Sequence, residues 1–240
     1  MDTEQVMKQA LEALRSGGVI LYPTDTVWGI GCDATDPSAV AKVYAIKHRS
    51  DAKSLVLLAS DLDMVARYVR EIPPMAVDLV EVNDAPMTLI YPGAIAGSAP
   101  SAASRSGEGR RNPCRPLGPC TGSEANRSDL GFDCLLPEAG GRRDHRRLAW
   151  NVVAEDGSVG IRIPMADLCR QLTFKLGRPI VSTSANISGE PTPVRFTDIP
   201  EEIKAACDFV FPPKSDTQST GKASQIIKIG LRGEVEIIRK

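Results

Sequence analysis

The chain has 240 residues, of which 42% are hydrophobic and 25% are charged, and its formal net charge is −1. This balance is typical of a soluble globular protein of about one domain. No run approaches the roughly 18 apolar residues of a membrane span, and the first residues lack the basic and apolar regions of a secretion signal. We therefore expect a cytoplasmic protein with no membrane contact.

The first sixty residues alternate between helical and extended patterns. Apolar residues recur at helical spacing between residues 6 and 14, and a glycine pair ends that helix. Residues 19–22 predict a short apolar strand. Residues 39–47 predict a second helix, and residues 54–59 predict a continuous apolar strand of the kind that is buried on both faces.

The remaining elements continue this alternation. Helices are predicted around residue 66 and at residues 75–82, 165–176 and 201–206. Strands are predicted at residues 87–91, 159–163, 180–183, 209–211, 225–229 and 235–238. The interleaving indicates an α/β fold, in which one twisted sheet of mixed parallel and antiparallel strands carries packed helices.

Residues 97–147 interrupt this pattern. The segment is rich in Gly, Ser, Ala, Pro and Arg and has almost no periodic apolar positions. It holds 9 arginines and 6 acidic residues, whereas the rest of the chain holds 20 basic and 24 acidic residues. Such a composition buries too little apolar surface to offset the entropy of ordering. We interpret it as a disordered insertion into a single domain of 240 residues, with an RNA-binding arm as the alternative.

The six cysteines contain no CxxC pair, and we expect them to be reduced thiols. Cys114, Cys120 and Cys134 could form a zinc site with His145, but their spacing is irregular. We therefore predict no protein-bound metal, and unpaired thiols in a loop remain the simpler interpretation.

Two polar segments directly follow predicted buried strands. Residues 22–31 read YPTDTVWGIG, and residues 182–189 read STSANISG. Ligands of open α/β sheets bind at the carboxyl ends of strands. The four hydroxyls of the second segment exceed what a turn requires and predict a cradle for phosphate oxygens and a small polar ligand. The first segment is equally compatible with a simple turn.

Basic residues cluster at the end of the predicted 39–47 helix. Lys47, His48 and Arg49 are consecutive, and Lys53 follows closely. Cations at this spacing suit a polyphosphate, with Lys47 and Arg49 exposed in a binding cavity. The alternative is a solvated basic helix end, which the helix dipole favours.

Several common catalytic patterns are missing from the sequence. It contains no GxxxxGK[ST], GxGxxG or HExxH motif, and His48 and His145 are its only histidines. Histidine-based acid–base catalysis is therefore poorly supported. The chemistry that remains is substrate positioning and charge neutralisation.

Taken in order, YPTDT with WGIG, then KHR, GIRIP and STSANISG, the sequence resembles the YrdC-like threonylcarbamoyl-AMP synthase family. The signature of that family joins Lys47 and Arg49 to Ser184 and Asn186. The resemblance covers the chain outside residues 97–147. It implies a twisted α/β sheet with a large, concave and positively charged cavity.

The resemblance also implies the roles of individual residues. Lys47 and Arg49 would be catalytic, and Mg²⁺ would accompany ATP. The residues implied for ATP are Lys47, Arg49, Lys53, Thr88, Ser184, Asn186, Thr192 and Arg239. The residues implied for threonine are Thr26, Arg162, Ser182 and Ser224.

The implied activity is that of an L-threonylcarbamoyladenylate synthase. Such an enzyme converts L-threonine, bicarbonate or CO2, and ATP into threonylcarbamoyl-AMP and pyrophosphate, for N6-threonylcarbamoyladenosine in tRNA. Its partner would be a downstream tRNA-modification transferase complex, and direct contact with tRNA stays open.

Two alternatives are a non-catalytic module that binds double-stranded RNA or tRNA, and a carbamoyl-transfer accessory domain. The acidic balance outside residues 97–147 disfavours RNA binding.

Overall fold

The computed structural model describes residues 3–48, 55–99, 145–217 and 219–240. Its main compact unit comprises Met1–Ala99 and Arg143–Lys240, and the fold below is that of this unit. The second unit, Pro100–Arg142, lies outside the described residues, and so does most of the predicted insertion at 97–147. No helix in the described ranges is long and apolar enough to cross a membrane.

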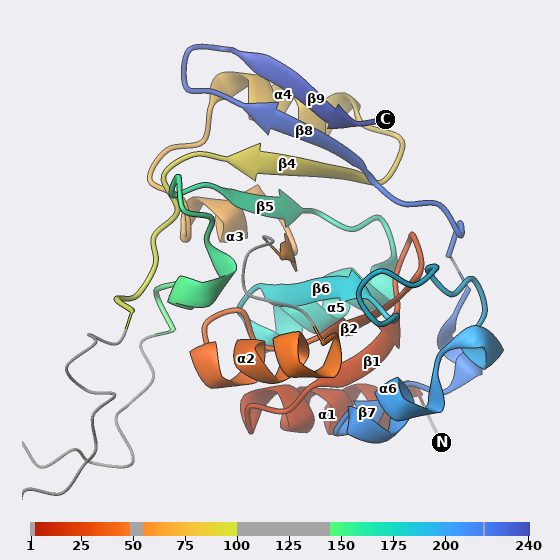
Figure 1. Ribbon diagram of the computed structural model, residues 1–240. Coiled ribbons are helices and arrows are strands. Elements are labelled where there is room, and N and C mark those ends of the chain that lie inside the picture. Colours follow the sequence, from red (N-terminus) through yellow and green to blue (C-terminus); the bar gives the residue numbers. More distant parts are fainter. Residues whose placement is uncertain (1–2, 49–54, 100–144, 218) are drawn as a thin grey trace, which may run out of the picture. The chain divides into compact units, whose positions relative to one another are not determined.

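The described strands form one sheet in the order β7-β1-β2-β6-β3-β5-β4-β8-β9, which Figure 1 shows from bottom to top. The strands are β1 (Ile20–Pro23), β2 (Trp28–Gly31), β3 (Val56–Leu58), β4 (Met87–Tyr91), β5 (Val159–Arg162), β6 (Ile180–Ser184), β7 (Phe209–Val210), β8 (Gln225–Ile229) and β9 (Val235–Arg239). The pairs β1–β7, β3–β5 and β4–β8 are parallel, and the other pairs are antiparallel. The predicted mixed α/β sheet is confirmed.

Helices pack on this sheet and bury one side of their surface. They are α1 (Thr3–Arg15), α2 (Pro37–Ile46), α3 (Leu62–Ala66), α4 (Pro74–Val82), α5 (Asp167–Leu176) and α6 (Glu201–Ala206). α1 contacts both α5 and β7. Its buried residues recur at helical spacing, as the sequence predicts. α2 begins where the Asp36 side chain accepts a hydrogen bond from the Ser38 backbone N–H, with Pro37 in the first turn.

The two faces of the central strands differ in chemistry because side chains alternate along each strand. On one face, Thr88, Arg162 and Ser182 project from β4, β5 and β6. On the opposite face, apolar residues such as Leu89 and Ile161 project from the same strands. The sheet therefore separates a polar side from an apolar core.

β2 is a strand that the sequence analysis did not predict. Two of its four residues are glycines, which are unfavourable in strands, so WGIG resembles a loop. The structure explains Gly31, because a Cβ atom at this position would lie 2.0 Å from the Val181 carbonyl oxygen. A larger residue there would separate β2 from β6, and with it the polar loop that joins β1 to β2.

The chain segments on either side of the predicted insertion lie next to each other. Ala96 forms a parallel bridge with Leu148, and the Gly97 N–H donates to the Leu148 carbonyl oxygen at 2.8 Å. The Leu148 N–H in turn donates to the Ile95 carbonyl oxygen at 2.9 Å. The main unit is therefore continuous across the base of this segment.

Candidate functional site

A cavity of about 540 Å³, called here the polar cavity, lies on the polar face of the sheet. Strands β2, β3, β5, β6, β8 and β9 supply its walls, together with the loop after β1 and the segment before β8. Seven of the residues implied for the substrates line it: Thr26, Arg162, Ser182, Ser184, Thr192, Ser224 and Arg239. Residues from distant parts of the sequence thus meet at one site.

Arg162 is fixed at the base of the polar cavity. Its Nη1 donates to Thr26 Oγ1 at 3.1 Å, and its Nη2 lies 3.3 Å from Asp25 Oδ1. The second Asp25 oxygen accepts a hydrogen bond from the Met165 N–H at 3.1 Å. Arg162 is 5% exposed, and its Nε has no hydrogen-bond partner among the described residues. Because Arg162 lines the cavity, its guanidinium charge is suited to an anionic or carbonyl oxygen of a ligand.

A chain of hydrogen bonds at the opposite wall orients Ser224. Its hydroxyl lies 2.9 Å from Thr88 Oγ1, and its carbonyl oxygen accepts bonds from Arg239 Nε at 2.9 Å and Nη2 at 2.8 Å. Burial lowers the pKa of Arg239, and the positive charge of Arg162 lowers it further. Two guanidinium groups therefore share one cavity. Thr88 does not line the cavity and holds Ser224 from behind.

The end of β6 contributes Ser182 and Ser184. Ser182 forms a hydrogen bond with the buried Tyr22 hydroxyl, which also donates to the Val181 carbonyl oxygen at 3.4 Å. Burial raises the pKa of Tyr22, so its phenol stays protonated and able to donate. The polar segment at the end of β6 therefore forms part of the polar cavity.

Lys47 departs from the expectation of an exposed cavity cation. It is 3% exposed, and Nζ donates to the carbonyl oxygens of Ser184 and Asn186 at 2.6 and 2.7 Å. Nζ also lies 3.3 Å from Asn186 Oδ1. Lys47 directly follows the last residue of α2. Its side chain faces the loop after β6, and that loop encloses the amine. In this structure Lys47 holds the Ser184–Asn186 turn in place.

Asn186 is likewise engaged within the loop. Its Nδ2 donates to the carbonyl oxygens of Ile187 and Glu190, and its Oδ1 accepts a hydrogen bond from Ser184 Oγ. The side chain is 7% exposed and does not line the polar cavity. The signature residues Lys47, Ser184 and Asn186 are thus brought together, and Ser184 is the one of the three that lines the cavity.

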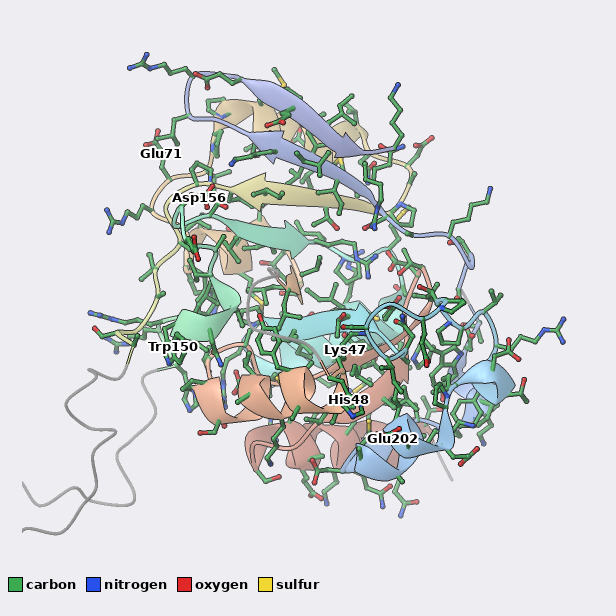
Figure 2. The ribbon with its side chains drawn as sticks, in the orientation of Figure 1. Lys47, His48, Glu71, Trp150, Asp156 and Glu202 are labelled. Atoms are coloured by element: carbon green, nitrogen blue, oxygen red, sulfur yellow. The ribbon has the colours of Figure 1, made fainter. Side chains whose placement is uncertain are left out.

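His48 follows Lys47 in a left-handed conformation, with φ of 48°, and this ends the helical path of α2. Its Nε2 lies 3.1 Å from Glu202 Oε1 on α6, and Figure 2 shows His48 and Glu202 near Lys47. Both side chains of this pair are 59% exposed. Arg49 and Lys53, which come next in the implied ATP site, lie outside the described residues.

The sequence analysis did not identify Asp216, Ser219 and Gly221, which precede β8 and contact Thr26 or Trp28. Ser219 Oγ donates to the Thr26 carbonyl oxygen at 2.8 Å, and the Gly221 N–H donates to the same oxygen at 2.7 Å. Trp28 Nε1 donates to Asp216 Oδ2 at 2.8 Å. These contacts fix Thr26 at the cavity wall. They join residues 188 or more positions apart, so no local pattern reports them.

Of the four residues proposed for a zinc site, the structure describes His145. Cys114, Cys120 and Cys134 lie outside the described residues. His145 Nδ1 lies 2.9 Å from Thr35 Oγ1 and 3.0 Å from Arg178 Nη1. Arginine only donates, so Nδ1 is the acceptor. Within the described ranges, no group of three or more His, Cys, Asp or Glu side chains could hold a metal ion. His145 is therefore anchored to the main unit.

Comparison with known proteins places this chain in a family. A family model that covers Sua5, YciO and YrdC proteins, with the description "Telomere recombination", matches residues 12–114 and 135–240. The chain therefore belongs to the Sua5/YciO/YrdC family. A protein of Chromohalobacter salexigens named threonylcarbamoyl-AMP synthase is 29% identical over 198 residues, which cover 82% of this chain and 80% of that relative.

Two solved structures share the fold. The crystal structure of P. abyssi Sua5 complexed with L-threonine has a TM-score of 0.68 at 19% identity, over 95% of this chain and 52% of that chain. The crystal structure of E. coli YciO has a TM-score of 0.66 at 19% identity, over 100% of this chain and 91% of that chain. This chain thus spans about half of the Sua5 chain and most of YciO.

These findings confirm the predicted family and the predicted α/β fold. The prediction of an enzyme is confirmed by the synthase name that the curated relatives carry. The individual roles of the site residues stay predictions.

Proposed function

We propose that this protein is an L-threonylcarbamoyladenylate synthase, which forms threonylcarbamoyl-AMP and pyrophosphate from L-threonine, bicarbonate or CO2, and ATP. The observation that carries the proposal is the polar cavity, which is lined by two arginines and seven residues that carry a hydroxyl. They are Arg162 and Arg239, with Thr24, Thr26, Ser182, Thr183, Ser184, Thr192 and Ser224. The names of the curated relatives support the same activity.

The reaction needs charge stabilisation more than a protein base. The threonine amine adds to CO2, loses a proton to solvent, and becomes a carbamate. A carbamate oxygen then attacks the α-phosphorus of ATP, and pyrophosphate leaves with the electrons of the broken P–O bond. Negative charge builds on phosphate oxygens during the second step, so preorganised cations at the cavity wall would lower its barrier.

The described residues suggest which side chains bind threonine and which bind ATP. Arg162 and Thr26, at the base of the polar cavity, would bind threonine together with Ser182 and Ser224. Arg239, on the edge strand, would face the phosphates of ATP beside Ser184 and Thr192. Lys47 would act through the loop after β6, because its amine is bonded to Ser184 and Asn186. Arg49 stays in the proposal on the family signature alone, and Lys53 stays in it on the family resemblance.

Mg²⁺ would arrive bound to the phosphates of ATP. Protein sites for Mg²⁺ supply one or two carboxylates as a rule, and no carboxylate lines the polar cavity among the described residues. The hydroxyl lining does not by itself make a magnesium site, and we derive no catalytic step from one.

The product would pass to a transferase complex that modifies tRNA, with N6-threonylcarbamoyladenosine as the final nucleoside. The competing functions are a non-catalytic module for double-stranded RNA or tRNA, and a carbamoyl-transfer accessory domain. Neither predicts that threonine and ATP turn over together.

The test is pyrophosphate release from ATP and bicarbonate, with and without L-threonine. We expect release to require L-threonine and to fall about 100-fold or more in Arg162→Met and Arg239→Met. Arg232→Met is the matched control, since Arg232 lies in the exposed turn between β8 and β9. Pyrophosphate release at the same rate with and without L-threonine would refute the proposed activity.

A further inference from the structure

A second cavity, called here the apolar cavity, lies on the face of the sheet opposite the polar cavity. Its volume is about 250 Å³, and α4, β4, β5 and the segment between β5 and α5 form its walls. Met87, Leu89 and Tyr91 of β4 line it, whereas Thr88 between them points to the polar face and bonds Ser224. Figure 1 shows β4 and β5 as neighbours in the middle of the sheet.

Tyr91 is the unusual residue of this cavity. It is 1% exposed, and its hydroxyl has no hydrogen-bond partner among the described residues. Burial alone raises its pKa, so the phenol is protonated and can donate. Within the described residues, Tyr91 Oη is not among the fully buried polar atoms that lack a partner, so the hydroxyl opens into the cavity, where an acceptor can reach it. The lone donor therefore points to an acceptor that the described protein groups do not supply.

Asn83 and Arg170 also line the apolar cavity, and they differ in how many hydrogen bonds their side chains already form. The Asn83 side chain forms hydrogen bonds within its own turn. Its Nδ2 donates to the Ala85 carbonyl oxygen, and its Oδ1 accepts from the Ala85 N–H. The Arg170 guanidinium, on α5, forms no hydrogen bond or ion pair among the described residues. Arg170 is exposed and borders the surface that carries Asp61 and Asp167, and its positive charge acts on Asp61. It thus provides a cation at the solvent side of the cavity.

We propose that the apolar cavity binds a small aliphatic carboxylate that carries a second hydrogen-bond acceptor away from its carboxylate. Its hydrocarbon part would lie among Met87, Leu89 and Ile161, its carboxylate would face Arg170, and its second acceptor would receive the Tyr91 hydroxyl. The volume suits a ligand of about ten non-hydrogen atoms, for which millimolar to micromolar affinity is reasonable.

This site is separate from the proposed activity but adjacent to its machinery. Met165 lines the apolar cavity, and its backbone N–H donates to Asp25 Oδ2 at 3.1 Å. Asp25 in turn pairs with Arg162 on the other face. A ligand beside Met165 would therefore lie one hydrogen bond away from the carboxylate that orients Arg162.

The test uses the full chain and three matched probes. These are 5-oxohexanoate, hexanoate without the oxo group, and 2-hexanone without the carboxylate. Binding is followed by NMR of the methyl groups of Met87, Ile161 and Met165, with no ATP and no turnover. We expect 5-oxohexanoate to bind about 5- to 10-fold more tightly than either truncated probe.

Two variants assign the two polar contacts. Tyr91→Phe should abolish the advantage of 5-oxohexanoate over hexanoate and leave its advantage over 2-hexanone. Arg170→Met should abolish the advantage of 5-oxohexanoate over 2-hexanone and leave its advantage over hexanoate. Arg232→Met should leave both advantages unchanged. Absence of localised shifts would overturn the proposal and would mean that water alone satisfies Tyr91. Advantages that survive both variants, or shifts confined to the polar cavity, would also overturn it.

Discussion

Asp25 and Arg162 form an ion pair at 3.3 Å between side chains that are 4% and 5% exposed. The pair places a guanidinium at the base of the polar cavity and aims its Nη1 at Thr26. Neither Asp25 Oδ1 nor Arg162 Nε has a hydrogen-bond partner among the described residues. The ion pair therefore orients Arg162 but leaves one of its hydrogen-bond donors, Nε, without a partner among the described residues.

Asp25→Asn should destabilise the fold and impair threonine use together. Removing one member of a buried pair leaves an uncompensated charge and typically costs about 3–5 kcal/mol. We expect the lower end of this range, since the pair is incompletely hydrogen-bonded. The checks are chemical denaturation and the KM for threonine, with Asp78→Asn at an exposed position of α4 as control. Equal stability of both variants would contradict the assigned role of Asp25.

Lys47→Met should destabilise the protein more than Lys42→Met. Lys47 Nζ contacts three oxygens of the loop after β6, whereas Lys42 Nζ is seen to donate to one, the Gly17 carbonyl oxygen at 2.8 Å. With about 1 kcal/mol per hydrogen bond, we expect losses of about 3 and about 1 kcal/mol. Denaturant midpoints of the two variants measure the difference. Indistinguishable midpoints would restore the view of Lys47 as an exposed ligand-binding cation.

Asp156 should titrate well below an ordinary aspartate. Hydrogen bonds from the Ser158 side chain, from Lys228 and from the Ser158 backbone lower its pKa from 3.8 to about 2. A lowered folded-state pKa means that the stabilisation is present above pH 3.8 and is lost as the pH falls toward 2. Figure 2 shows Asp156 on the loop that leads into β5.

Carboxyl-carbon NMR of Asp156 checks this directly, with an expected midpoint of about 2. Ser158→Ala should raise that midpoint toward 3.8, because it removes the largest contribution. A midpoint near 3.8 in the unmodified protein would show that these hydrogen bonds are not formed in solution.

Excising residues 100–142 should leave the main unit folded. The flanking segments already pair through Gly97 and Leu148, and changing the length of a connecting loop twofold alters closure entropy by only about 0.6 kcal/mol. Adding His145→Ala to the excised chain should lower stability by about 1–2 kcal/mol, because Arg178 loses an acceptor. Thermal melts compare the two chains. A large loss from the excision alone would make residues 100–142 part of the folded core.

Local patterns were enough to predict the helices and most strands, and to single out the polar segments after β1 and β6. The burial of Lys47 could not be predicted, because nothing in KHR shows that the loop after β6 folds over its amine. β2 was missed because its glycines meet a requirement of close strand approach at Val181, which is distant in sequence. The pairing of Asp25 could not be predicted, because its partner Arg162 lies on β5, which is distant in sequence.

The most direct measurement of the central claim is mass spectrometry of the nucleotide product formed from ATP, L-threonine and ¹³C-bicarbonate. We predict threonylcarbamoyl-AMP with the label in its carbamoyl carbon, formed together with pyrophosphate and in smaller amount by Arg162→Met. Conversion of ATP without this labelled adduct, or none with folded protein and all three substrates, would contradict it.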